Sequence, residues 1–208
     1  MSTTKTHAPT ALTALDVIFT RRSVRSFRPQ PIDRDTISGL IDAAVQAPTA
    51  MHVEPWAFAV VQNRALLARC SERAKHALLQ QMGTSTNVHA MADPSAAAAF
   101  RAQLMSPDFD IFHHAPALIV ICGKPAGSFV AADCWLAAEN LMLAATAMGL
   151  GTCCIGSALP VLTQPDVRAE LKIPAAYDVV AAIVVGVPAD DAAASGATRK
   201  PADILSWS

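Results

Sequence analysis

The stretch Ala117-Leu118-Ile119-Val120-Ile121-Cys122 is an unbroken apolar run that ends at Gly123. A short apolar run bounded by a chain-breaking residue is typical of a strand that is buried on both faces. Residues 129–148 follow it and are apolar nearly all round at helical spacing. A helix that is hydrophobic on every face lies inside a protein or at a subunit interface. The two segments together predict a sheet with helices packed over it.

The rest of the chain alternates between helical and strand patterns. Helices are predicted at residues 12–19, from Thr36 to before Pro48, at 64–81 and at 164–171, and further strands at 58–61 and 179–187. A chain of 208 residues with this alternation predicts one α+β domain, residues 14–208, behind a flexible leader, residues 1–13.

Residues 83–112 differ from their surroundings. They contain Gly83, Pro94 and Pro107, an alanine run at 96–99 and no strong periodicity. We expect an irregular excursion there, which serves either as a lid over a binding site or as a variable surface insertion.

Composition excludes several functional classes. The chain is 52% hydrophobic with a net charge of −1, which disfavours disorder and gives no field that would attract nucleic acid or an anionic membrane. The abundance of apolar residues favours tightly packed helices or an extensive subunit interface. No apolar run approaches the roughly 20 residues of a membrane span, and residues 1–13 lack the apolar core of a signal peptide. We expect a cytoplasmic protein.

The five cysteines form no C-x-x-C pair and have apolar neighbours, which predicts reduced, buried thiols. They are Cys70, Cys122, Cys134, Cys153 and Cys154.

Metal catalysis is one interpretation of the histidines and cysteines in this sequence. His52 and Glu54 resemble the H-x-E of zinc deaminases, which also need a later C-x-x-C. The adjacent cysteines at 153 and 154 cannot replace that pair, because neighbouring side chains point in different directions. His113 and His114 are adjacent as well. We therefore expect no metal site, and the sequence also has no G-x-S-x-G or G-x-G-x-x-G motif.

Positive charge concentrates in the segment Arg21-Arg22-Ser23-Val24-Arg25-Ser26-Phe27. Only 16% of the chain is charged, so this cluster needs a reason. Guanidiniums hold phosphate through paired hydrogen bonds, and hydroxyls add short donors beside them. The segment is a candidate phosphate cradle, and a solvated basic turn is the alternative.

Three further segments join this cluster in a pattern that resembles the nitroreductase family of FMN-dependent oxidoreductases. The first is Ala47-Pro48-Thr49-Ala50-Met51-His52-Val53-Glu54-Pro55-Trp56, similar to A-P-S-x-x-N-x-Q-P-W. The second, residues 149–156, is similar to G-L-G-x-x-P-I-G with Cys154 in place of proline. The third is Gly186-Val187-Pro188 followed by a late basic residue. The resemblance spans roughly residues 15 to 205.

The resemblance implies a role for each matching residue. Arg21, Arg22 and Ser23 would contact the FMN phosphate and ribityl chain, and Arg25 would contact the N1–O2 edge of the flavin. Pro48, Thr49, Ala50 and His52 would reach the flavin of a partner subunit. Cys154, Ile155 and Gly156 would lie against the ring near N5. Arg199, with Lys200 as the weaker candidate, would close on the phosphate.

Two positions depart from the family pattern. His52 replaces the usual asparagine and Glu54 the usual glutamine. A side-chain amide both donates and accepts hydrogen bonds. Each ring nitrogen of a neutral histidine does only one of the two, depending on the tautomer. A carboxylate would repel a flavin that becomes negative on reduction. We therefore expect His52 to face the flavin's pyrimidine edge from the partner subunit, Glu54 to bond within the loop, and Trp56 to anchor the core.

The resemblance also implies the assembly and the reaction. The fold would be a three-layer α-β-α arrangement with a mixed, mainly antiparallel sheet, in an intertwined homodimer with FMN at the subunit interface. NADH or NADPH would reduce the flavin at N5, and a nitroaromatic, quinone or related acceptor would reoxidise it in a ping-pong cycle without a side-chain acid or base. The altered loop leaves an alternative, a flavin-binding protein with little or no turnover.

Overall fold

The computed structural model of this chain describes residues 12–84, 93–190 and 199–208. Within these ranges one antiparallel sheet has the strand order β1-β2-β4-β3. Its strands are β1 (Trp56–Val61), β2 (Ala117–Gly123), β3 (Gly151–Cys154) and β4 (Asp178–Gly186). The apolar run that predicted a central strand is β2, and it is buried along its whole length.

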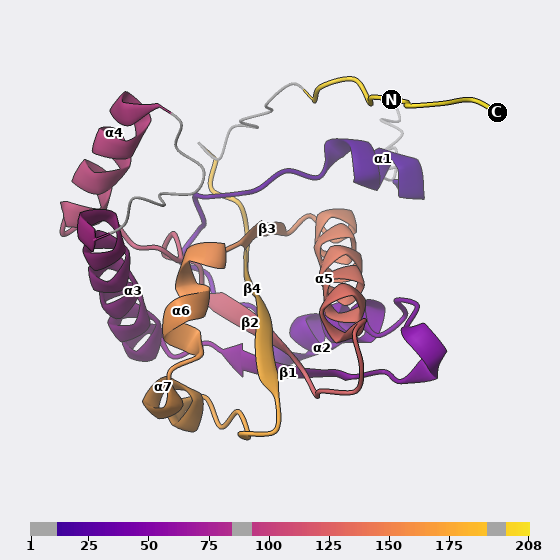
Figure 1. Ribbon diagram of the computed structural model, residues 1–208, viewed down its shortest axis with the longest axis horizontal. Helices are drawn as coiled ribbons and strands as arrows, with labels where there is room; N and C mark the ends of the chain where they lie inside the picture. Colours follow the sequence, from indigo (N-terminus) through magenta and orange to yellow (C-terminus); the bar gives the residue numbers. More distant parts are fainter. Residues whose placement is uncertain (1–11, 85–92, 191–198) are drawn as a thin grey trace, which may run out of the picture.

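Each face of the sheet is covered by helices, which gives three layers (Figure 1). On one face, Leu118 and Val120 of β2 pack with α3 (Arg64–Thr84) and α6 (Leu159–Leu162). On the other face, Ile119 and Ile121 pack with α2 (Arg34–Ala44) and α5 (Val130–Ala147). Because successive strand residues point to opposite faces, the continuous apolar run serves both cores. Full burial of each such side chain contributes about 1.5–3 kcal/mol.

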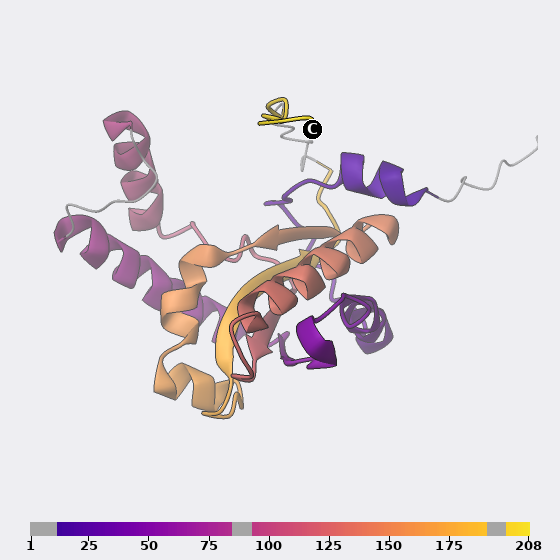
Figure 2. The same cartoon turned by 45° about the vertical axis from the view of Figure 1, so that its right-hand side comes forward.

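Smaller elements connect these layers. They are α1 (Ala14–Thr20), the 3₁₀ turn η1 (Ala50–His52), α4 (Pro94–Met105), the 3₁₀ turn η2 (Gly156–Ala158) and α7 (Pro165–Glu170). Figure 2 shows α4 leaning away from the sheet beyond the end of α3. Several helices start at a side-chain cap: Thr13 and Asp16 form a capping box on α1, and Asp33 accepts the backbone N–H of Thr36 at 2.7 Å on α2.

The irregular excursion predicted for residues 83–112 is wrong for much of that range. α3 continues to Thr84, and α4 occupies Pro94–Met105. The carboxylate of Asp93 accepts the backbone N–H of Ser95 at 2.9 Å, and Pro94 holds the first helical position. An acidic cap, a first-turn proline and an alanine run are a helix start, and the missing periodicity concealed it. Residues 85–92 lie outside the described residues.

The sequence analysis also did not predict the strand β3. Its four residues pair with β4 from Gly151 opposite Gly186 to Cys154 opposite Ile183. A short strand that begins with glycine has little strand propensity of its own, so pairing with β4 must hold it. The sheet was expected to be mixed, whereas every strand pair in the described residues is antiparallel. A parallel pairing occurs there as the isolated bridge between Ser23 and Thr152.

The other predicted elements are present with shifted ends. The helix predicted at residues 12–19 runs from Ala14 to Thr20, and the strand predicted at 58–61 starts at Trp56. Residues 1–11 of the expected leader lie outside the described part. All five cysteines are free thiols; four are buried as expected, and Cys154 is half-buried. In the described ranges no helix has the length and apolar character needed to cross a bilayer.

Candidate functional site

The arginine segment 21–27 is fixed along the outer edge of β3. The backbone N–H of Val24 donates to the carbonyl of Thr152 at 2.9 Å, and further on Phe27 forms a bridge with Pro188. Gly151 makes this approach possible, because a Cβ there would lie 2.7 Å from Cγ2 of Val24. Gly151 is therefore required for the close contact between the two segments.

A cavity of about 230 Å³ opens where this segment meets the end of β3. Two of the predicted motifs contribute to its wall: Arg25 from the arginine segment, and Cys154, Ile155 and Gly156 from residues 149–156. A Cβ built on Gly156 would meet nothing within 4 Å, so the backbone there borders open space. The fold thus brings together two motifs that lie far apart in the sequence.

Residues that sequence reasoning did not select complete the cavity wall. Phe100 and Gln103 come from α4, and Phe109, Ile111 and His113 come from the segment before β2. The wall also includes Cys153 and Ser157. The signal for α4 was present in its helix cap. No sequence pattern placed His113 beside Arg25.

At neutral pH the cavity's positive charge comes from Arg25. Burial raises the pKa of the Cys153 thiol, although Arg25 and a hydrogen bond from Ser23 act in the opposite direction. Burial also lowers the pKa of His113, and the charge of Arg25 adds to that effect. Cys153 is therefore a thiol and His113 a neutral imidazole, because burial disfavours the charged form of each.

The other residues predicted to bind the phosphate do not all lie at the Arg25 cavity. The Arg21 side chain is 17% exposed, with its Nε 3.5 Å from Oε1 of Glu139 on α5. Arg22 donates from Nη1 to the carbonyls of Phe19 and Arg21, both at 2.8 Å. Neither guanidinium lines the cavity with Arg25.

Ser23 lies beside β3 through its bridge to Thr152, next to the cavity rather than in its wall. Arg199 and Lys200 are exposed, and neither side chain makes a hydrogen bond or ion pair within the described residues.

The loop at residues 47–56 lies elsewhere on the same chain. The backbone N–H of Ala50 donates to Oδ1 of the buried Asp133 on α5 at 3.2 Å. Pro48, Thr49, Ala50 and His52 do not line the Arg25 cavity. Figure 1 shows this loop between α2 and β1, away from the N-terminal segment that leads out of α1. A single chain therefore does not unite the loop with the cavity.

The loop has an unusual backbone. Met51, His52 and Glu54 have φ values of 57°, 55° and 46°, in the left-handed region that non-glycine residues seldom adopt. Met51 is 92% exposed. The backbone N–H of Glu54 donates to Oγ1 of Thr49 at 3.4 Å, and Trp56 packs half-buried against the α2–α5 core, as expected of an anchor. Strained, exposed residues of this kind cluster at binding sites.

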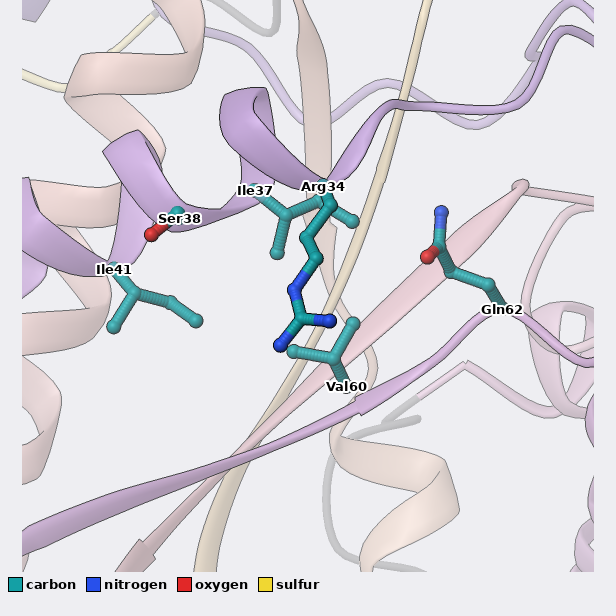
Figure 3. A pocket seen from close by; sticks show the side chains of 6 residues that line it. All are labelled: Arg34, Ile37, Ser38, Ile41, Val60 and Gln62. Carbon is teal, nitrogen blue, oxygen red and sulfur yellow. The ribbon is translucent and has the colours of Figure 1, made fainter.

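A larger cavity of about 380 Å³ lies between α2 and the edge strand β1. Figure 3 shows Arg34 reaching from the start of α2 toward Val60 of β1, with Ile37 and Ile41 beside it. The Gln62 side chain, also in its wall, donates to the carbonyl of Ile32 at 2.6 Å. Among the described residues of its wall, Arg34 is the only charged one, and most of the other lining side chains are apolar. This cavity is therefore the weaker candidate for a functional site.

In the described part of the chain, no group of three or more His, Cys, Asp or Glu side chains is arranged to hold an ion.

Comparison with known proteins places this geometry in a class. The sequence model of the nitroreductase family matches residues 18–187, a range that includes the arginine segment, the 47–56 loop and β3. The chain belongs to the nitroreductase family.

Individual relatives cover nearly the whole chain. A crystal structure of a nitroreductase with bound FMN from Bacteroides fragilis is 29% identical, covers 92% of this chain and 94% of its own, and superposes with a TM-score of 0.69. A protein of Archaeoglobus fulgidus, provisionally named NADH dehydrogenase/NAD(P)H nitroreductase, is 29% identical over 182 residues, 85% of this chain and 86% of that protein.

A more distant structure shares the fold. It is an FMN-dependent nitroreductase from Mycobacterium smegmatis in complex with NADPH, which is 24% identical, covers 91% of this chain and 94% of its own, and has a TM-score of 0.64.

Proposed function

We propose that this chain is an FMN-dependent oxidoreductase that takes hydride from NADH or NADPH and delivers it to a nitroaromatic, quinone or related acceptor. The observation that carries the proposal is the cavity that unites Arg25 with Cys154, Ile155 and Gly156. The FMN bound by the Bacteroides fragilis relative and the NADPH bound by the Mycobacterium smegmatis enzyme support it.

The residues of the cavity suit a flavin. A flat ring needs an open backbone surface on one side, and the strand end at Ile155 and Gly156 borders open space. The pyrimidine edge needs a cationic donor, and Arg25 in the same cavity wall would supply one. Arg199, whose side chain makes no bond within the described residues, would hold the phosphate and ribityl chain together with Arg21, Arg22 and Ser23. When bound, FMN supplies a site, its N5, that accepts and donates hydride.

The chain's own residues would bind and orient. Arg25 would stabilise negative charge that develops at the pyrimidine edge, because a fixed cation in a partly enclosed site interacts more strongly than in water. Phe100 and Phe109, which line the cavity, would exclude water from it. The cytoplasm is the proposed location, and the five unpaired cysteines support it.

A homodimer is part of the proposal. Apolar side chains remain exposed along α1 and α5, among them Phe19 at 71% and Leu136 at 46%. Exposed apolar patches of this kind mark interaction surfaces. In a dimer, Pro48, Thr49, Ala50 and His52 of one chain would complete the cavity of the other, which explains why a single chain separates them.

The test is spectroscopic. The purified protein, supplied with FMN, should be yellow and should bleach when NADH or NADPH is added under nitrogen. Arg25→Ala should weaken FMN binding, while Arg34→Ala removes a guanidinium at the other cavity and should leave binding unchanged. Colour without bleaching would favour the flavin-binding alternative, and failure to bind FMN would overturn the proposal.

A further inference from the structure

We propose that His113 takes up a proton when the Arg25 cavity receives a hydride, and that it gives this proton to the acceptor that removes the hydride. The inference rests on the proposed function and assigns the proton in its reaction to a residue of this chain. It starts from the position of His113, which lines the same cavity as Arg25, Ile155 and Gly156.

His113 also lines an adjoining cavity of about 330 Å³. Four residues border both cavities and so form the boundary between them: Arg25, Gln103, Phe109 and His113. His113 is the only one of the four whose charge changes near neutral pH. It therefore lies between the proposed flavin site and a second, more polar chamber that contains Asp108 and His114.

The backbone holds His113 in a fixed and uncommon conformation. His113 and His114 have φ values of 55° each. The Asp110 carboxylate accepts the backbone N–H of Phe112 at 2.9 Å and that of His114 at 3.0 Å, and the Asp110 carbonyl accepts the N–H of His113 at 2.9 Å. The hydroxyl of Ser71 accepts the N–H of Ile111 at 3.0 Å. A turn with every amide satisfied in this way presents its side chains with little freedom.

The imidazole itself is available for chemistry. Within the described residues, neither ring nitrogen of His113 forms a hydrogen bond or an ion pair. Phe109 contacts it edge to face, with ring centroids 6.3 Å apart and planes at 71°. The aromatic contact restricts the orientation of the ring, and His113 itself lines the cavity. His114 differs, because its Nδ1 lies 3.4 Å from Oδ2 of Asp110 and its side chain is 73% exposed.

The surroundings of His113 keep it neutral before any hydride arrives. Burial lowers its pKa below the usual 6.5, and the cation of Arg25 and then His114 add to this effect, while Asp110 opposes it. Because these contributions are electrostatic, a new negative charge in the cavity must raise the pKa of His113.

Other groups around the imidazole do not compete for the proton. Burial raises the pKa of Cys153 and Cys154 on β3, so both remain neutral thiols. From α4 come the uncharged Phe100 and Gln103, and Asp108 lies in the adjoining chamber.

The charges balance in such a cycle. NAD(P)H loses a hydride as its C–H bond breaks, and leaves as NAD(P)⁺, so the site gains two electrons and one negative charge. A proton from solvent moves onto His113 and cancels that charge. An acceptor then takes the hydride and the proton together; a quinone, for example, gains two electrons and two hydrogens. The imidazole returns to its neutral form.

The first test follows the proton directly by NMR of histidine-labelled, FMN-loaded protein. The His113 resonances, identified with His113→Asn, should titrate below pH 6.5 in the oxidised protein and at a higher pH after chemical reduction. An unchanged His113 titration in the reduced protein would overturn the proposal.

The second test measures the two-electron midpoint potential against pH. One pH unit is a tenfold change in proton concentration, which for a two-electron couple corresponds to about 30 mV for each proton taken up. Between the two His113 titrations, the wild-type slope should exceed that of His113→Asn by this amount. Asparagine is chosen because it tolerates the left-handed backbone.

Matched variants decide the remaining outcomes. His114→Asn changes the adjacent histidine at the same backbone angle and should keep the wild-type slope. A slope that is unchanged in His113→Asn, or that flattens in His114→Asn, would overturn the assignment while the proposed function stands. Failure to bind FMN would overturn both.

Discussion

Arg21 is the residue at which the phosphate cradle is most directly tested. Arg21→Ala should remove a charge-assisted contact of about 1.5–3 kcal/mol. FMN affinity should then fall about tenfold or more, while riboflavin, which has no phosphate, should bind nearly as before. Fluorescence titration with both ligands measures the difference. Equal losses for the two would contradict the phosphate assignment.

Glu139 supplies the control for this variant, because it now pairs with Arg21 at 3.5 Å. Glu139→Gln removes the competing carboxylate and keeps the guanidinium, so FMN binding should be unchanged or tighter. A loss of affinity in this variant would mean that the ion pair itself positions Arg21.

His113 makes a second residue-scale prediction, on stability. Its pKa is lower in the folded chain than the unfolded value of 6.5, so the unfolded chain binds more protons as the pH falls. The stabilisation from neutral His113 is complete above pH 6.5 and is lost as the pH falls through the folded pKa. Urea unfolding of the FMN-free protein between pH 8 and about 5 should show a smaller loss for His113→Asn than for the wild type.

The site was only partly predictable at this scale. Arg25, Cys154, Ile155 and Gly156 were selected from their motifs, and the structure places them around one cavity. His113 was noticed only as half of an adjacent pair. Its position depends on the Asp110 turn and on packing against Phe109, and neither contact has a local sequence signature.

Among the elements, α4 is a helix that sequence periodicity did not reveal. Leu104 on this helix is 1% exposed, whereas its neighbour Met105 is 65% exposed. Leu104→Ala should cost about 2–5 kcal/mol of the free energy of unfolding, because it leaves a cavity in packed surroundings. Met105→Ala should change it by less than about 0.5 kcal/mol. Chemical denaturation measures both, and equal small effects would show that the segment does not pack as a fixed helix.

The strands show why some elements could be predicted and others could not. β2 and β4 were predicted because long apolar runs determine burial on both faces. β3 has four residues, and its identity as a strand comes from pairing with β4 and from the close approach of Val24 at Gly151. These causes lie in partners distant in sequence, so no local pattern could reveal them.

For the molecule as a whole, the proposed dimer can be tested by mass. Sedimentation of the FMN-bound protein should give about twice the 21.8 kDa of one chain. The exposed apolar residues of α1 and α5 are the expected dimer contact. Phe19→Asp should therefore shift the protein toward the monomer, and the same variant should lose its FMN. A stable monomer that retains FMN would contradict shared sites.

The loop at residues 47–56 belongs to this scale, because only an assembly would bring it to a flavin. His52 has a φ of 55°, which asparagine also tolerates, so His52→Asn should keep the backbone of the loop. Glu54 is exposed, and glutamine at that position removes a charge that would repel a reduced flavin. The double variant His52→Asn with Glu54→Gln should therefore fold as the wild type does and bind FMN equally or more tightly. Fluorescence titration decides: a loss of tenfold or more would show that both residues are specialised contacts rather than tolerated departures from the family pattern.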